Sequence, residues 1–215
     1  MNKVAMLVTT YTGGIDQDEK RYMRKTMCRK LKEQGHYVCL ASHSTIDRET
    51  QSYCDYFIYD ADNSFQHKGQ PVTGGNYGIA IMRSTENALM KLKSLGFTHF
   101  FKVDYDNPPD IDYHALIADC EATGKKCVTT NWGDLESFST MALYCEIDFY
   151  LKTLNLDENA HLVNQFLEGV WYRIIASKGL LVDVYVPGYT NNFFGRDIVS
   201  YYGNGGTTKM GSYPY

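Results

Sequence analysis

The chain has 215 residues, a formal net charge of -4 and 44% hydrophobic residues. This length and apolar content suit one folded domain with a sizeable core and are too small for two full domains. The acidic balance predicts no broad surface for a polyanion, which argues against nucleic acid as a partner. No apolar stretch reaches the ~18 residues that span a bilayer, and the first apolar run is too short for a signal peptide. We therefore expect a soluble protein with no stable membrane insertion.

The cysteines indicate a reducing compartment. The six of them show no Cys-x-x-Cys spacing, and several lie in apolar stretches in which free thiols pack well. We therefore expect a cytoplasmic protein. The cysteines are Cys28, Cys39, Cys54, Cys120, Cys127 and Cys145.

In chain order, predicted strands alternate with predicted helices. The strands are apolar runs, and the helices show apolar residues at intervals of three or four and end near glycines. The predicted strands cover 3–10, 37–41, 55–59, the start of 97–110, 126–130, 139–147 and 180–186. The predicted helices run from Asp16 or Asp18 to Gly35, and over 77–95, 113–120 and 162–179. Residues 64–76 are rich in helix and strand breakers, which predicts an irregular loop.

This alternation predicts an α/β fold with a Rossmann-like, mostly parallel central sheet flanked by helices. The sequence shows no internal repeat of useful length and no linker between two folding units. We therefore predict a single domain over residues 1–200. Residues 201–215 are rich in Gly, Tyr, Asn and Thr and contain almost nothing that could build a core, so we predict a flexible tail or lid.

The predicted central strand ends in two aspartates, and two prolines that require a turn follow them. Asp104 and Asp106 are two residues apart, so in an extended backbone their side chains point to the same side. Asn107-Pro108-Pro109 cannot continue a sheet, which predicts that both acids lie at an exposed lip. Carboxylates without a nearby Cys or His pair favour Mg²⁺ or Mn²⁺ over zinc, and such an ion completes its shell with waters and substrate phosphates. The pattern therefore predicts a phosphorylated substrate.

Polar residues also follow the other predicted strands. They lie at 9–11, 42–43, 60 and 131–134. Ligands of open α/β sheets bind at the carboxyl ends of the strands, so this many polar strand ends predict one site at that edge. The chain contains no Walker loop and no Gly-x-Gly-x-x-Gly after the first strand, which argues against a nucleoside triphosphatase and a dinucleotide enzyme.

Three stretches resemble the nucleotide-sugar glycosyltransferases of the GT-A fold. They are Thr-Thr-Tyr at 9–11, Gly-Asn-Tyr-Gly-Ile-Ala-Ile-Met-Arg at 75–83 and Lys-Val-Asp-Tyr-Asp at 102–106. The likeness covers most of residues 3–195, and residues 42–63 are also similar to small glycosyltransferases of phages and large DNA viruses. The resemblance implies a hexosyltransferase of the Asp-x-Asp type with a role in viral glycan synthesis, in the host cytoplasm if the protein is viral.

The resemblance further implies a site for a nucleotide-sugar donor, with a UDP-sugar such as UDP-glucose as the first choice. Tyr11 would stack on the nucleobase with Thr9 and Thr10 nearby, and Asp60 would accept a hydrogen bond from the base edge. The acceptor implied by the resemblance is a glycan or another hydroxyl.

A metal at the diphosphate is implied as well. Asp104 would face the ribose and the metal, and Asp106 would bind the Mn²⁺ or Mg²⁺ that bridges the diphosphate. Arg83 matches a helix arginine that lies beside the diphosphate in many relatives. Many relatives also supply a further metal ligand, commonly a histidine, from the C-terminal region, whereas this chain has no histidine there. Asn191, Asn192 or water could take its place.

On the acceptor side, the resemblance implies an acidic base near the start of a late helix. Glu168 matches that position, and Asp134 and Glu136 are its competitors. A base at Glu168 would imply inversion at the anomeric carbon, and retention stays open. Two rival functions stay open as well. A sugar-nucleotide pyrophosphorylase shares the sheet and the metal, although the loop 11–16 lacks the basic residue of such enzymes, and a nucleotide- or carbohydrate-binding module would bind without turnover.

Overall fold

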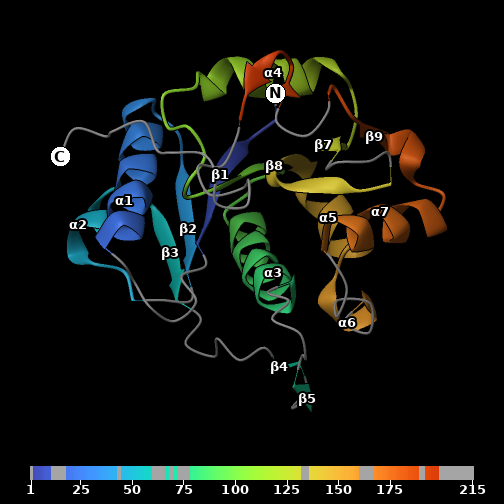
Figure 1. Ribbon diagram of the computed structural model, residues 1–215, viewed down its shortest axis with the longest axis horizontal. Coiled ribbons are helices and arrows are strands. Elements are labelled where there is room, and N and C mark those ends of the chain that lie inside the picture. The colour runs from blue at the N-terminus through green and yellow to red at the C-terminus, as the bar shows by residue number, and fades with distance from the viewer. Residues whose placement is uncertain are drawn as a thin grey trace.

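A seven-stranded sheet runs through the middle of the protein. The computed structural model describes residues 2–10, 18–42, 45–59, 66–67, 70–71, 78–131, 136–159, 167–188 and 192–198. The strands of the sheet are β1 (Val4–Thr10), β2 (Val38–Ser42), β3 (Tyr56–Tyr59), β6 (His99–Asp104), β7 (Cys127–Asn131), β8 (Phe138–Glu146) and β9 (Val184–Tyr185). Their order is β3-β2-β1-β6-β8-β7-β9 (Figure 1). Strand β8 runs antiparallel to both neighbours and the other pairs are parallel, which confirms the predicted α/β class.

Helices cover both faces of this sheet. The described α-helices are α1 (Asp18–Glu33), α2 (Arg48–Ser52), α3 (Gly78–Ser94), α4 (Tyr113–Ala122), α5 (Ile147–Thr153), α6 (Leu156–Asn159) and α7 (Leu167–Ser177). Figure 1 shows α4 above the sheet and α3, α5 and α7 below it. Two short antiparallel pairs are β4 (Gln66–His67) with β5 (Gln70–Pro71), and β10 (Asn192–Phe193) with β11 (Arg196–Asp197). None of the described helices is both long and apolar enough to cross a membrane.

The pleat of the strands divides the apolar residues between two cores. On β1, Met6 and Val8 pack with apolar residues of α1 and α4. Ala5 and Leu7 point to the other face and pack with apolar residues of α3, α5 and α7. Because both faces of the sheet are buried, its central strands have continuous apolar sequences instead of alternating ones. This is why they could be predicted as apolar runs.

Most predicted elements are confirmed to within a few residues, and the predicted last strand is wrong over its first half. Residues 181–183 form a 3₁₀ helix, and only Val184–Tyr185 form the strand β9. Val182 is 73% exposed, so the apolar run at this edge of the sheet does not build the core. The helices α2, α5 and α6 were not predicted, nor was the strand pair β4 and β5 within the predicted irregular loop. Residues 199–215 lie outside the described part of the chain, so the domain over 1–200 and the tail over 201–215 stay predictions.

All six cysteines are free, and five of them are buried. Burial, with a smaller contribution from Cys54, raises the pKa of the Cys39 thiol to about 12. Burial also raises the pKa of Cys120 well above its usual range. Because the thiolate is the reactive form of cysteine, these buried thiols are packing groups, as the sequence predicts.

Two stacked histidines join the end of α1 to the start of α4. The ring centroids of His36 and His114 are 3.9 Å apart with 25° between the planes. His114 Nε2 donates to the carbonyl of Gln34 at 2.6 Å. Burial, and then the neighbouring His114, lower the pKa of His36 to about 4. The folded protein therefore holds His36 neutral at pH values at which the unfolded chain protonates it.

We expect the protein to lose stability on acidification between pH 6.5, the ordinary pKa of histidine, and pH 4, the pKa of folded His36. Above this window His36 is neutral in both states, and within it the unfolded chain binds a proton that the folded protein does not. The loss is complete below the window and amounts to roughly 3 kcal/mol.

Urea unfolding of the wild type and of His36→Phe across this window tests the expectation. Phenylalanine keeps a stacked ring but cannot titrate, so the variant should show a flatter dependence of the free energy of unfolding on pH. His99, whose pKa is also lowered by burial, is present in both proteins and provides the shared background. Equal slopes in the two proteins would contradict the assignment to His36.

Candidate functional site

The carboxyl ends of three parallel strands meet at one edge of the sheet. Strand β1 lies between β2 and β6, with Thr10 opposite Ser42 and Thr9 opposite Asp104. Thr10 Oγ1 donates to Ser42 Oγ at 2.9 Å. Thr9 Oγ1 donates to Asp104 Oδ1 at 2.6 Å. The structure thus brings together four of the polar residues that the sequence places at the strand ends.

A lysine inside the sheet is a further partner of Asp104. Lys102 is 1% exposed and Asp104 is 27% exposed, and Lys102 Nζ donates to Asp104 Oδ1 at 2.7 Å. The register places Lys102 between Leu7 and Leu143, and both leucines belong to the core under α3, α5 and α7. Residues two apart on a strand share a face, so Lys102 and Asp104 both point to the α3 side of the sheet.

Lys102 was not predicted as a site residue, although the sequence carries a signal for it. A charged residue in a strand that is buried on both faces needs a buried partner, because an unpaired charge in the interior is costly. Asp104 is the next acidic residue on the same face of that strand. Lysine and aspartate at this spacing in an apolar strand therefore predict an internal ion pair.

A turn held by Asn107 follows the strand. Strand β6 ends at Asp104, and Tyr105 and Asp106 lie in the turn. Asn107 N donates to the carbonyl of Asp104 at 3.1 Å, and Asp104 N donates to Asn107 Oδ1 at 3.0 Å. Asn107 Nδ2 donates to the carbonyl of Ile198 at 3.2 Å. One buried asparagine therefore ends the strand and ties the C-terminal segment to the turn.

This turn changes the expected geometry of the two acids. The prediction that Asp104 and Asp106 project together assumed an extended backbone, whereas Asp106 lies beyond the strand. Asp106 is 6% exposed, so the prediction of an exposed lip is wrong for this residue. It lines a small hollow with Tyr22, Met23 and Thr26 of α1. Helix α1 covers the face of the sheet opposite α3, so the hollow that Asp106 lines lies on the α1 side.

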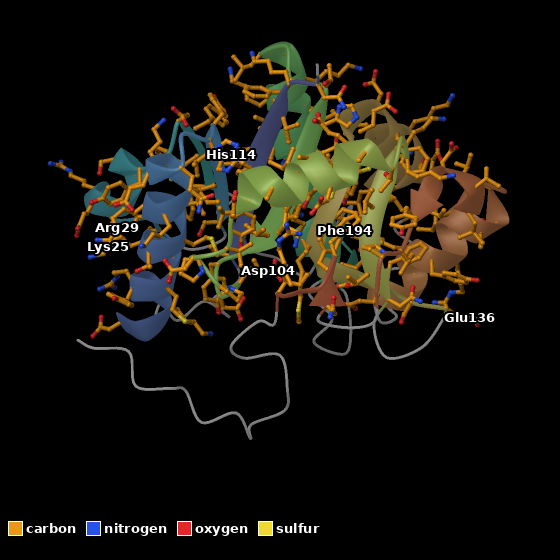
Figure 2. All side chains as sticks on the ribbon, turned by 90° about the horizontal axis from the view of Figure 1, so that it is seen from above. Lys25, Arg29, Asp104, His114, Glu136 and Phe194 are labelled. Atoms are coloured by element: carbon orange, nitrogen blue, oxygen red, sulfur yellow. The ribbon has the colours of Figure 1, made fainter. Side chains whose placement is uncertain are left out.

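Two other predicted residues come from helices on the Asp104 side. Arg83 is half-buried in the second turn of α3, and Glu168 is half-buried in the first turn of α7. Both helices pack on the core that contains the neighbours of Lys102. Glu136 is exposed, and Figure 2 shows it at the edge of the molecule, away from Asp104.

Several predicted residues lie outside the part of the chain that the structure describes. They are Tyr11, His43, Asp60, Asp134 and Asn191. Asn192 is described, and its Oδ1 accepts a hydrogen bond from Gly195 N at 2.7 Å, within the turn between β10 and β11. The side-chain oxygen of Asn192, which was predicted as a possible metal ligand, therefore already accepts a hydrogen bond within the β10–β11 hairpin.

The described residues offer few ligands for a metal. Among them, no group of three or more His, Cys, Asp or Glu side chains is arranged to hold an ion. The carboxylates of Asp104 and Asp106 are hard oxygen donors of the kind that Mg²⁺ and Mn²⁺ prefer. They fit such an ion as partial ligands, and a bound diphosphate and water would have to complete its shell.

No protein-family model matches the chain, and no curated protein matches it in sequence. Solved structures match it in fold. A protein from Desulfovibrio desulfuricans G20 described as a nucleotide-diphospho-sugar transferase is 8% identical, with a TM-score of 0.52 over 88% of this chain and 81% of that chain. The 4-diphosphocytidyl-2C-methyl-D-erythritolsynthase from Anaerococcus prevotii DSM 20548 is 9% identical, with a TM-score of 0.56 over 92% of both chains.

A third structure is a glycosyltransferase involved in the glycosylation of the major capsid of PBCV-1. It is 11% identical, with a TM-score of 0.51 over 86% of this chain and 83% of that chain. At these identities the likeness concerns the fold. It confirms an architecture similar to GT-A transferases and to nucleotidyltransferases.

We expect Asp104 to be needed for stability as well as for binding. Asp104→Asn keeps an oxygen for Thr9 but removes the carboxylate from a buried ammonium, which should lower the free energy of unfolding by about 3 kcal/mol. Adding Lys102→Met removes the buried charge, so the double variant should return to within about 1 kcal/mol of the wild type. Urea denaturation of the wild type, the two single variants and the double variant measures the coupling between the two side chains. If the losses in free energy of unfolding are strictly additive, the pair is not coupled.

Proposed function

We propose that this protein transfers a hexosyl group from a nucleotide-sugar donor to an acceptor hydroxyl. The observation that carries the proposal is the cluster of Thr9, Thr10, Ser42 and Asp104 at the carboxyl edge of the sheet. This edge is the ligand-binding edge of open α/β sheets. The likeness in fold to a protein described as a nucleotide-diphospho-sugar transferase and to a glycosyltransferase supports the choice of reaction.

The donor would lie along the ends of β1, β2 and β6, and a UDP-sugar such as UDP-glucose is the donor that we propose. Tyr11 and Asp60 would hold the nucleobase beside Thr9 and Thr10. Asp104 Oδ1 is already fixed by hydrogen bonds from within the protein. Its second oxygen, Oδ2, would therefore be the one that meets a ribose hydroxyl or an ion.

The chemical task is to stabilise the negative charge that develops on the diphosphate as the glycosidic bond breaks. Mn²⁺ or Mg²⁺, when bound, would supply part of that stabilisation, and Asp104 and Asp106 are the residues that would hold it. Arg83, on the Asp104 side of the sheet, would neutralise charge on the diphosphate. Glu168 would accept the proton of the acceptor hydroxyl as the new bond forms, which corresponds to inversion.

A glycan is the acceptor that we propose, with a role in viral glycan synthesis in the host cytoplasm. The structural neighbour that is involved in the glycosylation of the major capsid of PBCV-1 supports this choice. The net charge of -4 argues against a nucleic-acid acceptor, since affinity for the phosphate backbone depends on positive charge.

A second candidate is nucleotidyl transfer, in which a phosphate monoester attacks a nucleoside triphosphate and pyrophosphate leaves. The likeness in fold to the 4-diphosphocytidyl-2C-methyl-D-erythritolsynthase, with a TM-score of 0.56 over 92% of both chains, favours this reaction. The products separate the two reactions. Transfer from a UDP-sugar releases UDP, whereas nucleotidyl transfer from a triphosphate releases pyrophosphate.

Calorimetric titration of UDP, GDP and CMP with and without Mn²⁺ tests the donor site. We expect one diphosphate to bind, and to bind more tightly with Mn²⁺, because ion and diphosphate complete each other's coordination. Asp106→Asn should weaken the Mn²⁺-dependent binding by about tenfold or more. Asp110→Asn is the matched control, because Asp110 lies exposed in the same connecting segment as Asp106 and pairs with Lys30 of α1. Absence of binding in every metal condition would reject the proposed function.

The base is tested by Glu168→Gln, which keeps the shape of the side chain and removes its basicity. We expect the rate of UDP release from the UDP-sugar to fall by roughly a hundredfold or more, while the dissociation constant of UDP stays within about twofold. Glu136→Gln, at the distant edge of the molecule, should keep the wild-type rate. A Glu168→Gln variant with full activity would exclude the assigned base.

A further inference from the structure

We propose that Lys102 is a resident cation of the donor site and competes with a divalent ion for Asp104. A divalent ion would then bind well only when a nucleotide diphosphate brings further negative charge and further oxygen ligands. The inference relies on the proposed function for the identity of the nucleotide. The competition at Asp104 follows from the ion pair itself.

The geometry uses up one oxygen of the carboxylate. Asp104 Oδ1 accepts from Lys102 Nζ at 2.7 Å and from Thr9 Oγ1 at 2.6 Å. A carboxylate oxygen has about two lone-pair positions, so these two donors fill those of Oδ1. Bidentate coordination of an ion by Asp104 is thereby blocked, and Oδ2 is left as the oxygen for a ligand.

The charge of Lys102 acts in the same direction as the geometry. Lys102 is 1% exposed, so little water screens its ammonium from Asp104. The ammonium and the carboxylate together are close to neutral. An approaching divalent ion therefore meets a weaker attraction than an unpaired aspartate would provide, and it meets the repulsion of the ammonium behind it.

The turn limits the help that the second acid can give. Asp106 lies beyond the strand and lines the hollow on the α1 side, whereas Asp104 points to the α3 side. The extended geometry that would align the two carboxylates therefore ends at Asp104. Because Lys102 offsets the charge of Asp104, a nucleotide diphosphate is left as the main source of negative charge for an ion.

Binding of Mn²⁺ to the free protein, followed by electron paramagnetic resonance, tests the competition. We expect Lys102→Met to bind Mn²⁺ roughly tenfold more tightly than the wild type, because a positive charge has been removed from the carboxylate. The gain from adding UDP should shrink in the same variant. Lys102→Gln removes the charge but keeps a hydrogen-bond donor, and it should behave in the same way, so that a folding defect of one variant does not decide the outcome.

Two control variants separate charge from other effects. Thr9→Val removes the other donor to Asp104 Oδ1 without changing charge, and it should not tighten Mn²⁺ binding by the same factor. Lys126→Met removes a lysine that pairs with Asp183 and precedes β7, at the end of that strand away from the candidate site. This variant should bind Mn²⁺ with the affinity of the wild type. A tightening in Lys126→Met equal to that in Lys102→Met would mean that net charge alone is responsible, and it would overturn the inference.

The outcomes distinguish this inference from the proposed function. If UDP and Mn²⁺ bind together to the wild type but the Lys102 variants bind Mn²⁺ no more tightly, the competition is refuted and the donor site stands. If the Lys102 variants gain Mn²⁺ affinity but UDP binds to none of the proteins, the competition stands and the proposed donor site is refuted. Absence of Mn²⁺ binding to the Lys102 variants also refutes the competition.

Discussion

The arrangement of the candidate site depends on the buried ion pair between Lys102 and Asp104. A lysine that is 1% exposed is tolerated in a central strand because a carboxylate lies 2.7 Å from its Nζ. Strand β6 has β1 on one side and β8 on the other, so the sheet fixes Lys102 from both sides. The position of Asp104 is therefore set by the packed sheet. A carboxylate held in this way is better ordered than one carried by a loop.

The turn after β6 extends this order toward the C-terminal segment. Asn107 bonds to the strand end and also donates to the carbonyl of Ile198. The hairpin of β10 and β11 is anchored by Phe193, whose ring meets that of Phe101 edge to face at 5.8 Å. The next residue, Phe194, has a φ of 52°, a conformation that costs a bulky side chain roughly 1 kcal/mol or more. The buried anchor beside it and the bond to Asn107 offset that strain and hold the segment against the site.

How far the sequence predicts each part depends on whether the cause is local. The sheet could be predicted because burial on both faces leaves long apolar runs, and Thr9 and Asp104 could be placed because they follow such runs. Asp106 was misplaced because the strand already ends at Asp104, where Asn107 closes a turn, and the side chain of Asn107 also bonds to a carbonyl 91 residues further along the chain. No local pattern contains that contact. Lys102 needed one more step, the recognition that it shares a buried face with Asp104.

The double role of Asp104 affects how an Asp-x-Asp motif can be tested in this protein. A substitution of Asp104 removes the proposed ligand group and also leaves a buried ammonium unbalanced, so lost activity would not by itself identify a metal ligand. A substitution of Asp106 leaves the ion pair in place, because Asp106 lies in the turn on the α1 side. The same pair constrains both candidate reactions in one respect. Glycosyl and nucleotidyl transfer each build negative charge on phosphate, and an internal ammonium that lowers the affinity of the empty site for an ion makes ion binding follow the nucleotide. The ion pair therefore bears on the order of binding, whichever bond of the nucleotide is broken.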